Sequence, residues 1–286
     1  MSSSCAMTTA RLEPLADHAG VRVHAGAVAR FEAADYAAVN DLLHRKQVLS
    51  FPGQSLTPAE LVRFGRAFGD LQLHVLQEFT LPGFPEIYVL SNEVADGRRV
   101  GNPKEGYGWH TDMSYMRRTT AYTILYALKV PQHGGNTLFA NAFAAYDALD
   151  PARQARLAGL RAVFSYRRLY GVRVGVTPLT DEQKAKTPDV LHPLVRTHPY
   201  TGRKGLYLGG IEVAGVDGMP DEAGMRLVAE LLEFATQERF QLSYPWASGD
   251  LVIWDNRGLL HTASEYDHTR QLRTLHRVSV EGEEPA

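Results

Sequence analysis

Two histidines and one aspartate are the side chains of this sequence best suited to act together as a metal site. His110 and Asp112 stand two positions apart in the segment 108–112, GWHTD, and side chains two apart on an extended chain project to the same face. His261, at the end of the run 251–261, is the candidate third ligand. Two imidazoles and one carboxylate cover one face of a metal ion and leave its other positions open, which is typical of non-haem Fe(II) oxygenases.

The spacing of His110 and Asp112 is by itself a weak signal, because the chain contains 11 histidines and a His-x-Asp triplet arises readily by chance. Cysteine offers no alternative set of ligands. The single cysteine, Cys5, stands in a polar N-terminal segment, so the chain has no partner cysteine for an internal disulfide or a thiolate cluster. Any metal must therefore be held by histidines and carboxylates.

The composition is that of an ordinary globular protein: 286 residues, 44% hydrophobic, 22% charged, with a formal net charge of -2. These values exclude a disordered, collagen-like or coiled-coil chain. The 30 basic and 32 acidic residues form no cationic block, which argues against a nucleic-acid partner. No apolar run approaches the roughly 20 residues that span a bilayer, and residues 1–10 lack a signal-peptide pattern. We therefore expect a cytoplasmic protein with a small-molecule partner and no membrane contact.

Hydrophobic periodicity predicts a β-rich chain with a few outer helices. Helical spacing occurs in 31–46, 58–68 and 220–237. Short β-rich runs bounded by turn residues occur at 47–51, 86–91, 121–128, 137–140, 194–198, 205–208, 250–255 and 272–280. Many short strands separated by glycine and proline favour a sandwich or a barrel.

The chain shows no repeat, low-complexity tract or linker that would divide it. At roughly 150 residues per domain the length alone allows two domains, but we expect a flexible N-terminal tail over 1–10 and a single domain over 11–286. Segments 92–108 and 167–189 have no steady period. Long irregular segments in a compact domain are often lids or binding loops, so we expect both at the mouth of an active site.

Further motifs lie beyond the three metal-ligand candidates. Arg273 follows His261 by twelve residues, Arg277 follows by four more, and 134–137 reads GGNT. This combination resembles the taurine dioxygenase and dichlorophenoxyacetate dioxygenase (TauD/TfdA) family of Fe(II)/2-oxoglutarate enzymes. The likeness runs from about 12 to 280 and includes 50–54 (SFPGQ), 64–69, 145–149 (AYDAL), 192–198 (HPLVRTH) and 254–257 (WDNR). Segment 219–240 and the pair at 266–267 look closer to the herbicide-degrading branch. The chain departs from the family at Asn136, where aspartate is usual.

The resemblance implies a mainly β, α+β fold: a double-stranded β-helix, or jelly roll, with peripheral helices. It implies that His110, Asp112 and His261 hold Fe(II), and that Thr137 and Arg273 bind 2-oxoglutarate. A planar guanidinium and a hydroxyl suit the distal carboxylate of that cosubstrate. By the same resemblance the substrate contacts are Arg277, His74, Tyr170 and Met113, with no catalytic residue beyond the metal centre.

The implied activity is an Fe(II)- and 2-oxoglutarate-dependent dioxygenase that uses O2 to hydroxylate a small organic anion. A buried arginine without an anion is costly, so Arg277 predicts a carboxylate, sulfonate or sulfate on the substrate. We expect an aryloxyalkanoate-like carboxylate, with C–O cleavage after hydroxylation, and a homo-oligomeric enzyme. The alternatives are a sulfonate or alkylsulfate dioxygenase, a non-catalytic anion-binding jelly-roll protein, and a zinc hydrolase.

Overall fold

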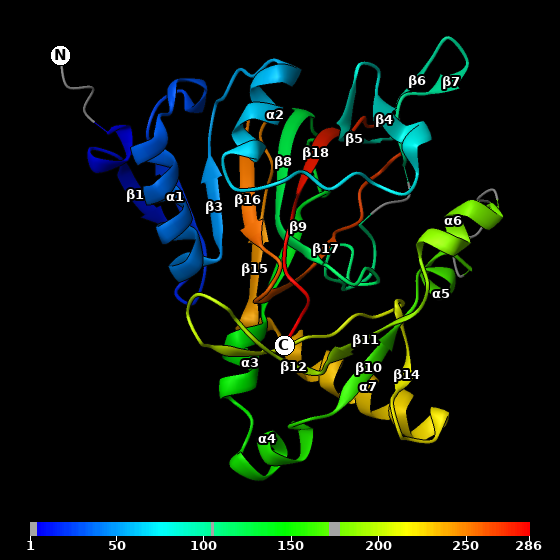
Figure 1. Cartoon of the computed structure of the whole chain (residues 1–286). Helices are drawn as coiled ribbons and strands as arrows, with labels where there is room; N and C mark the ends of the chain where they lie inside the picture. The colour runs from blue at the N-terminus through cyan, green and yellow to red at the C-terminus, as the bar shows by residue number, and fades with distance from the viewer. Residues whose placement is uncertain (1–4, 104–105, 172–177) are drawn as a thin grey trace.

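An eight-stranded sheet forms the larger layer of the structure, a computed structural model that describes residues 5–103, 106–171 and 178–286 (Figure 1). Its strand order is β1 (Arg11–Pro14), β2 (Val21–His24), β3 (Val48–Phe51), β16 (Leu251–Asp255), β8 (Thr120–Lys129), β18 (Thr274–Glu281), β5 (Phe84–Ser91) and β4 (Thr80–Leu81). All pairs are antiparallel except β2 with β3, which run parallel. The strand expected at 86–91 begins two residues earlier, at Phe84. The strands expected at 47–51, 121–128, 250–255 and 272–280 agree with β3, β8, β16 and β18 to within two residues at each end.

A smaller sheet packs against the inner face of the large one. It consists of β15 (Gln241–Tyr244), β9 (Thr137–Asn141) and β17 (Leu259–Ala263). One apolar cluster joins the two layers, and within it the ring centroids of Phe139 and Trp254 lie 5.3 Å apart. Facing sheets with a shared apolar core are the arrangement of a jelly roll. The predicted mainly β fold with peripheral helices is confirmed.

Side-chain alternation along the central strands serves both faces of the large sheet. On β8, Ile124 joins the outer core under the helices, whereas Leu125 joins the inner core between the sheets. On β18, Val278 faces out and Leu275 faces in. Because successive strand residues point to opposite faces, Thr123 on β8 lies on the inner side with Leu125. This alternation decides which polar side chains reach the interior.

Helices cover the outer face of the large sheet, the far end of the molecule and one of its sides (Figure 1). They are α1 (Ala33–Lys46), α2 (Pro58–Arg66), α3 (Ala142–Asp147), α4 (Pro151–Leu157), α5 (Tyr166–Gly171), α6 (Asp181–Lys186) and α7 (Asp221–Ala235). Helices α1, α2 and α7 are the three that hydrophobic spacing predicts. The remaining strands form a sheet of β10 (Arg161–Phe164), β11 (Val190–Pro193) and β14 (Val213–Val216), and two pairs, β12 (Val195–Thr197) with β13 (Lys204–Leu206) and β6 (Val94–Ala95) with β7 (Arg98–Arg99).

The segments without a clear period have structure of their own where they are described. Segment 92–108 contains the β6–β7 hairpin, and 167–189 contains most of α5 and all of α6; positions 104–105 and 172–177 lie outside the described residues. In the segment expected to be a flexible tail, Ala6–Thr8 forms a 3-10 turn whose Met7 amide donates to Asp35 on α1 at 3.1 Å. Residues 1–4 are likewise outside the description. Among described helices, none is long and apolar enough to cross a membrane.

Candidate active site

Backbone pairing brings His110 to His261 although 151 positions separate them in the sequence. The amide of His110 donates to the carbonyl of His261 at 3.0 Å, and the amide of His261 donates back at 2.9 Å. This isolated antiparallel bridge attaches the 108–112 segment to the edge of β17. The two imidazole rings consequently lie side by side, with centroids 4.2 Å apart.

Asp112 completes a group of three metal-binding side chains. The ligand atoms of His110, Asp112 and His261 all lie within 4.8 Å of one another. The Nε2 atoms of the histidines stand 3.8 Å and 3.6 Å from the Asp112 oxygens, distances too long for direct hydrogen bonds. With its proton on Nδ1, His110 donates to the carbonyl of Gly108 at 2.7 Å, so its Nε2 lone pair faces the group. Two imidazoles and a carboxylate in this arrangement fit a ferrous ion.

Charge in this group suits a divalent cation. Burial alone would raise the pKa of Asp112, but the positive charge of Arg277 and the neighbouring histidines hold it well below its ordinary value. Burial, together with repulsion from His110, lowers the pKa of His261 to about 3 against the attraction of Asp112. At neutral pH the site therefore presents a carboxylate and a neutral imidazole, the protonation states that bind metal.

A cavity lies beside the three metal-binding side chains, and buried arginines line it. Arg273 and Arg277 both line it, together with Thr137, His261 and Trp254. Arg273 is only 9% exposed and forms no ion pair with any described residue; its Nε donates to the carbonyl of Gly135 at 3.2 Å. Burial lowers the pKa of its guanidinium. A buried guanidinium without a carboxylate partner is costly, so an anion bound in this cavity would offset that cost.

Thr137 lies in the same cavity with its hydroxyl oriented by a tryptophan. The indole Nε1 of Trp246 donates to Thr137 Oγ1 at 3.0 Å. Because an indole only donates, the hydroxyl hydrogen of Thr137 is left to point elsewhere. Asn136, the departure from the family pattern, donates from its side-chain amide to Ser243 on β15 at 3.0 Å and does not line this cavity.

A second cavity, distinct from the one that Arg273 lines, is also bordered by Asp112. Of the predicted substrate contacts, His74, Met113 and Arg277 are among its walls. The ring of Tyr88 joins two of them, because Arg277 lies over it at 4.9 Å and His74 packs on it at 4.0 Å. Met113 has a positive φ of 49°, an unusual conformation for this residue type that often marks a functional site.

The structure places Tyr170 one layer behind the cavity wall. Its ring packs against that of Tyr166 with centroids 5.7 Å apart, and it is Tyr166 that lines the cavity, with the ring of Tyr115 tilted against it at a centroid distance of 4.3 Å. Other lining residues that sequence reasoning missed are Tyr107, Thr111, Leu169, Ile211 and Glu212. No periodic pattern singles them out, because they come from loops and from short elements. Of the two segments expected at the mouth, 92–108 contributes Tyr107 and 167–189 contributes Leu169.

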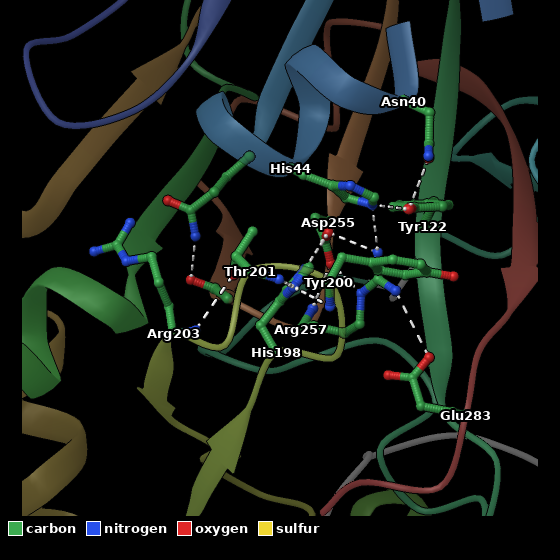
Figure 2. A network of polar contacts seen from close by, with 12 residues as sticks. Asn40, His44, Tyr122, His198, Tyr200, Thr201, Arg203, Asp255, Arg257 and Glu283 are labelled. Atoms are coloured by element: carbon green, nitrogen blue, oxygen red, sulfur yellow. Dashed lines mark hydrogen bonds and ion pairs between the residues drawn. The ribbon is translucent and has the colours of Figure 1, made fainter. Parts of the chain in front are cut away.

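A second cluster of histidines and aspartate lies in the polar network around the β16–β17 turn (Figure 2). The ligand atoms of His44, His198 and Asp255 also lie within 4.8 Å of one another. Here, however, Arg257 binds both oxygens of Asp255, each at 2.8 Å, and His198 donates to the same carboxylate at 3.0 Å. The guanidinium already supplies the positive charge that a metal would bring. This cluster is a structural ion-pair network.

Fold and site together define a class: a jelly roll with two histidines and one aspartate at its open interior has the architecture of a non-haem Fe(II) oxygenase. The family model described as "Taurine catabolism dioxygenase TauD, TfdA family" matches residues 11–279. The chain belongs to this family, and it is an Fe(II)- and 2-oxoglutarate-dependent dioxygenase. The resemblance found in the sequence is confirmed.

Individual relatives agree with this placement. The chain is 38% identical over 247 residues to the alpha-ketoglutarate-dependent 2,4-dichlorophenoxyacetate dioxygenase of Cupriavidus pinatubonensis, covering 82% of this chain and 85% of that one. It is 32% identical over 275 residues to the (S)-phenoxypropionate/alpha-ketoglutarate-dioxygenase of Delftia acidovorans, covering 91% of each. The crystal structure of AAD-2 in complex with Mn(II) and N-oxalylglycine superposes with a TM-score of 0.78 at 31% identity, covering 97% of this chain and 99% of that one.

Proposed function

We propose that this dioxygenase hydroxylates an aryloxyalkanoate-like carboxylate at the carbon that bears the ether oxygen. The observation that carries the proposal is the composition of one cavity: a cationic Arg277 at the metal-binding group and an aromatic wall of Tyr115 and Tyr166. An anionic head and an aromatic body on one substrate match these two features. Two of the relatives are named for aryloxyalkanoate substrates, which supports the same class.

The metal is Fe(II), and the residues that would hold it are His110, Asp112 and His261. When bound, iron together with 2-oxoglutarate and O2 supplies the oxidation: 2-oxoglutarate yields succinate and CO2, one oxygen atom enters succinate, and the other replaces hydrogen on the substrate carbon as a hydroxyl. With an aryloxyacetate the hydroxylated product is a hemiacetal. Its C–O bond breaks to give a phenol and an aldehyde, without a further oxidant.

The protein's part in this chemistry is to hold two anions in place. Arg273 and the hydroxyl of Thr137 would bind the distal carboxylate of 2-oxoglutarate, because the buried guanidinium has no carboxylate partner among the residues that the structure describes. Trp246 would keep the Thr137 hydroxyl turned toward that carboxylate. Hydroxylation by this chemistry requires no general base from the protein, so the proposal assigns none.

The substrate anion would lie at Arg277 and His74, next to Asp112. Tyr88 supports both side chains from one ring, which fixes their separation. Met113 and the paired rings of Tyr115 and Tyr166 would cover the aromatic body and exclude water from the reacting carbon. Tyr170 would act on the substrate through Tyr166, against which it packs.

A product assay tests the proposal. Purified protein is supplied with Fe(II), 2-oxoglutarate and O2, together with a phenoxyacetate, a 2-phenoxypropionate, taurine or an alkyl sulfate. We expect phenol and succinate in equal amounts from an aryloxyalkanoate. Sulfite from taurine, or an aldehyde and inorganic sulfate from the ester, in place of phenol would establish the sulfonate or alkylsulfate alternative. Anion binding without succinate would indicate a non-catalytic protein, and turnover without O2 a zinc hydrolase.

The oligomeric state and the cellular location of the protein stay predictions. We propose a homo-oligomer, which analytical ultracentrifugation would test, and a cytoplasmic location, which cell fractionation would test. The small anionic partner is supported by the cationic side chains Arg273 and Arg277 that line the cavities.

A further inference from the structure

A threonine hydroxyl holds one oxygen of Asp112. Thr123 lies on β8 with a fully buried side chain, and its Oγ1 donates to Asp112 Oδ2 at 2.6 Å. The other oxygen, Oδ1, accepts from Arg277 Nη1 at 3.2 Å. Each oxygen of the carboxylate thus has a donor of its own. Two donors on one carboxylate fix its plane as well as its position.

The direction of the Thr123 hydrogen bond is set by a chain of donors that starts at Trp254. The indole Nε1 of Trp254 donates to Asn256 Oδ1 at 3.0 Å, and because an indole cannot accept, this contact fixes which end of the amide is the oxygen. The amide nitrogen then donates to Thr123 Oγ1 at 2.8 Å. The Thr123 oxygen accepts from Asn256, so the single hydrogen of its hydroxyl is free to donate, and it donates to Asp112.

The fold holds this chain of hydrogen bonds rigidly. Thr123 stands opposite Trp254 in the antiparallel register of β8 with β16, and Asn256 follows two residues later at the turn into β17. Asn256 is fully buried, and its backbone N–H donates to the carbonyl of Ala121 at 2.8 Å. Its neighbours in sequence belong to the ion-pair network of the turn (Figure 2). The side chains therefore have little freedom to reorient.

We propose that Thr123 and Asn256 are positioning residues of the iron site. The one-way chain from Trp254 through Asn256 and Thr123 holds the carboxylate of Asp112 in the orientation that binds the metal, before the metal arrives. The inference rests on the proposed role of Asp112 as a ligand. Loss of such a supporting hydrogen bond weakens metal binding by about 10-fold to 100-fold in other metal sites.

The test compares three variants in the anaerobic binding of Mn(II), followed by the loss of the electron paramagnetic resonance signal of the free ion. Thr123→Val removes the hydroxyl and keeps the branched shape, whereas Thr123→Ser keeps the hydroxyl. Thr120→Val is the matched control: Thr120 is also fully buried on β8, and its hydroxyl donates to Gln72 at 2.7 Å, away from the iron ligands. The temperature of unfolding without metal is measured for each variant.

We expect Thr123→Val to bind Mn(II) about 10-fold to 100-fold more weakly than wild type, and Thr123→Ser and Thr120→Val to stay within about 3-fold of it. Thr123→Val and Thr120→Val should lose similar amounts of stability without metal, which separates positioning from folding. If Thr123→Val does not fold, the smaller Thr123→Ala carries the same expectation. The proposal is overturned if Thr123→Val binds Mn(II) as tightly as Thr120→Val, or if Thr123→Ser is as weak as Thr123→Val. Wild-type protein that binds no Mn(II) would remove the metal site itself.

Discussion

Arg277 Nη1 lies 3.2 Å from Asp112 Oδ1. The cation proposed to bind the substrate therefore touches the carboxylate proposed to bind the metal. Arg277 lines both cavities, the one that contains Arg273 and the one with the aromatic wall. A substrate anion held at this guanidinium would lie beside the metal, and the carbon next to that anion would be the one nearest to the oxidising centre.

Replacing Arg277 should separate substrate binding from cosubstrate binding. In Arg277→Gln the dissociation constant of an aryloxyalkanoate should rise by about 100-fold, because the loss of one partner of a buried charge pair costs about 2 to 5 kcal/mol. The constant for 2-oxoglutarate should change by less than about 5-fold. Titration calorimetry of the metal-loaded protein measures both. Equal losses, or no loss in either, would show that the substrate anion lies elsewhere.

Replacing Arg273 should affect cosubstrate binding and stability in opposite directions. Arg273→Met removes the bidentate partner of the distal carboxylate, so 2-oxoglutarate should bind at least about 100-fold more weakly. The same change removes a buried cation that has no acidic partner among the described residues, so the ligand-free protein should unfold about 2 °C higher. Calorimetric titration and thermal unfolding provide the two measurements. A variant that keeps its 2-oxoglutarate affinity would exclude Arg273 from this role.

The hydrogen bond from Trp246 to Thr137 predicts a smaller effect. Trp246→Phe keeps an aromatic ring and removes the donor, so the Thr137 hydroxyl loses the contact that orients it. A hydrogen bond of this kind contributes about 1 kcal/mol, and 2-oxoglutarate should bind about 3-fold to 10-fold more weakly while Mn(II) affinity is unchanged. An equal loss for both ligands would instead mean that the whole pocket has been disturbed.

The ion-pair network of the turn predicts a stability effect with a defined pH dependence. Burial would raise the pKa of Asp255, but Arg257 and the hydrogen bond from His198 hold it far below its ordinary value. Asp255→Asn leaves the buried guanidinium without its partner, so the free energy of unfolding at pH 7 should fall by about 3 to 5 kcal/mol. Urea denaturation of both proteins between pH 7 and pH 3 measures the difference.

The sign of that pH dependence follows from the lowered pKa in the folded state. A carboxyl whose pKa falls on folding contributes its stability above the unfolded value of about 3.9, and the contribution is lost as the pH drops toward the folded value. The gap between wild type and Asp255→Asn should therefore be constant from pH 7 to about pH 5 and should narrow below about pH 4. A gap that stays constant down to pH 3 would mean that Asp255 is not held ionised by the network.

The sequence was informative about the site because its residues have chemically restricted uses. His110 and Asp112 stand two positions apart, and the distant His261 ends the run 251–261. What the sequence could not give was the register that joins them. The bridge between His110 and His261 is a pairing of backbone groups, and hydropathy does not specify which residues of two distant strands face each other.

The turn that leads into strand β17, which carries His261, shows why some residues of the site could not be predicted from the sequence. The expected strand at 250–255 ends where β16 does, but the sequence pattern predicts no strand at β17, and the turn at 256–258 between the two strands contains a side chain pointing inward. Asn256 looks like an ordinary turn residue in sequence, yet in the structure it is fully buried and bonded to Thr123. Tyr115 and Tyr166 reach the cavity from a loop and a short helix, where side-chain direction follows no period.

The most direct test of the iron site is an anaerobic titration of the protein with Fe(II) and 2-oxoglutarate, followed by visible absorption. The site of His110, Asp112 and His261 predicts a charge-transfer band that saturates at one iron and one 2-oxoglutarate per chain, shifts when an aryloxyalkanoate is added, and is lost in His261→Ala. Wild-type protein that gives no band under saturating ligands, or a His261→Ala variant that retains it in full, would contradict the site described here.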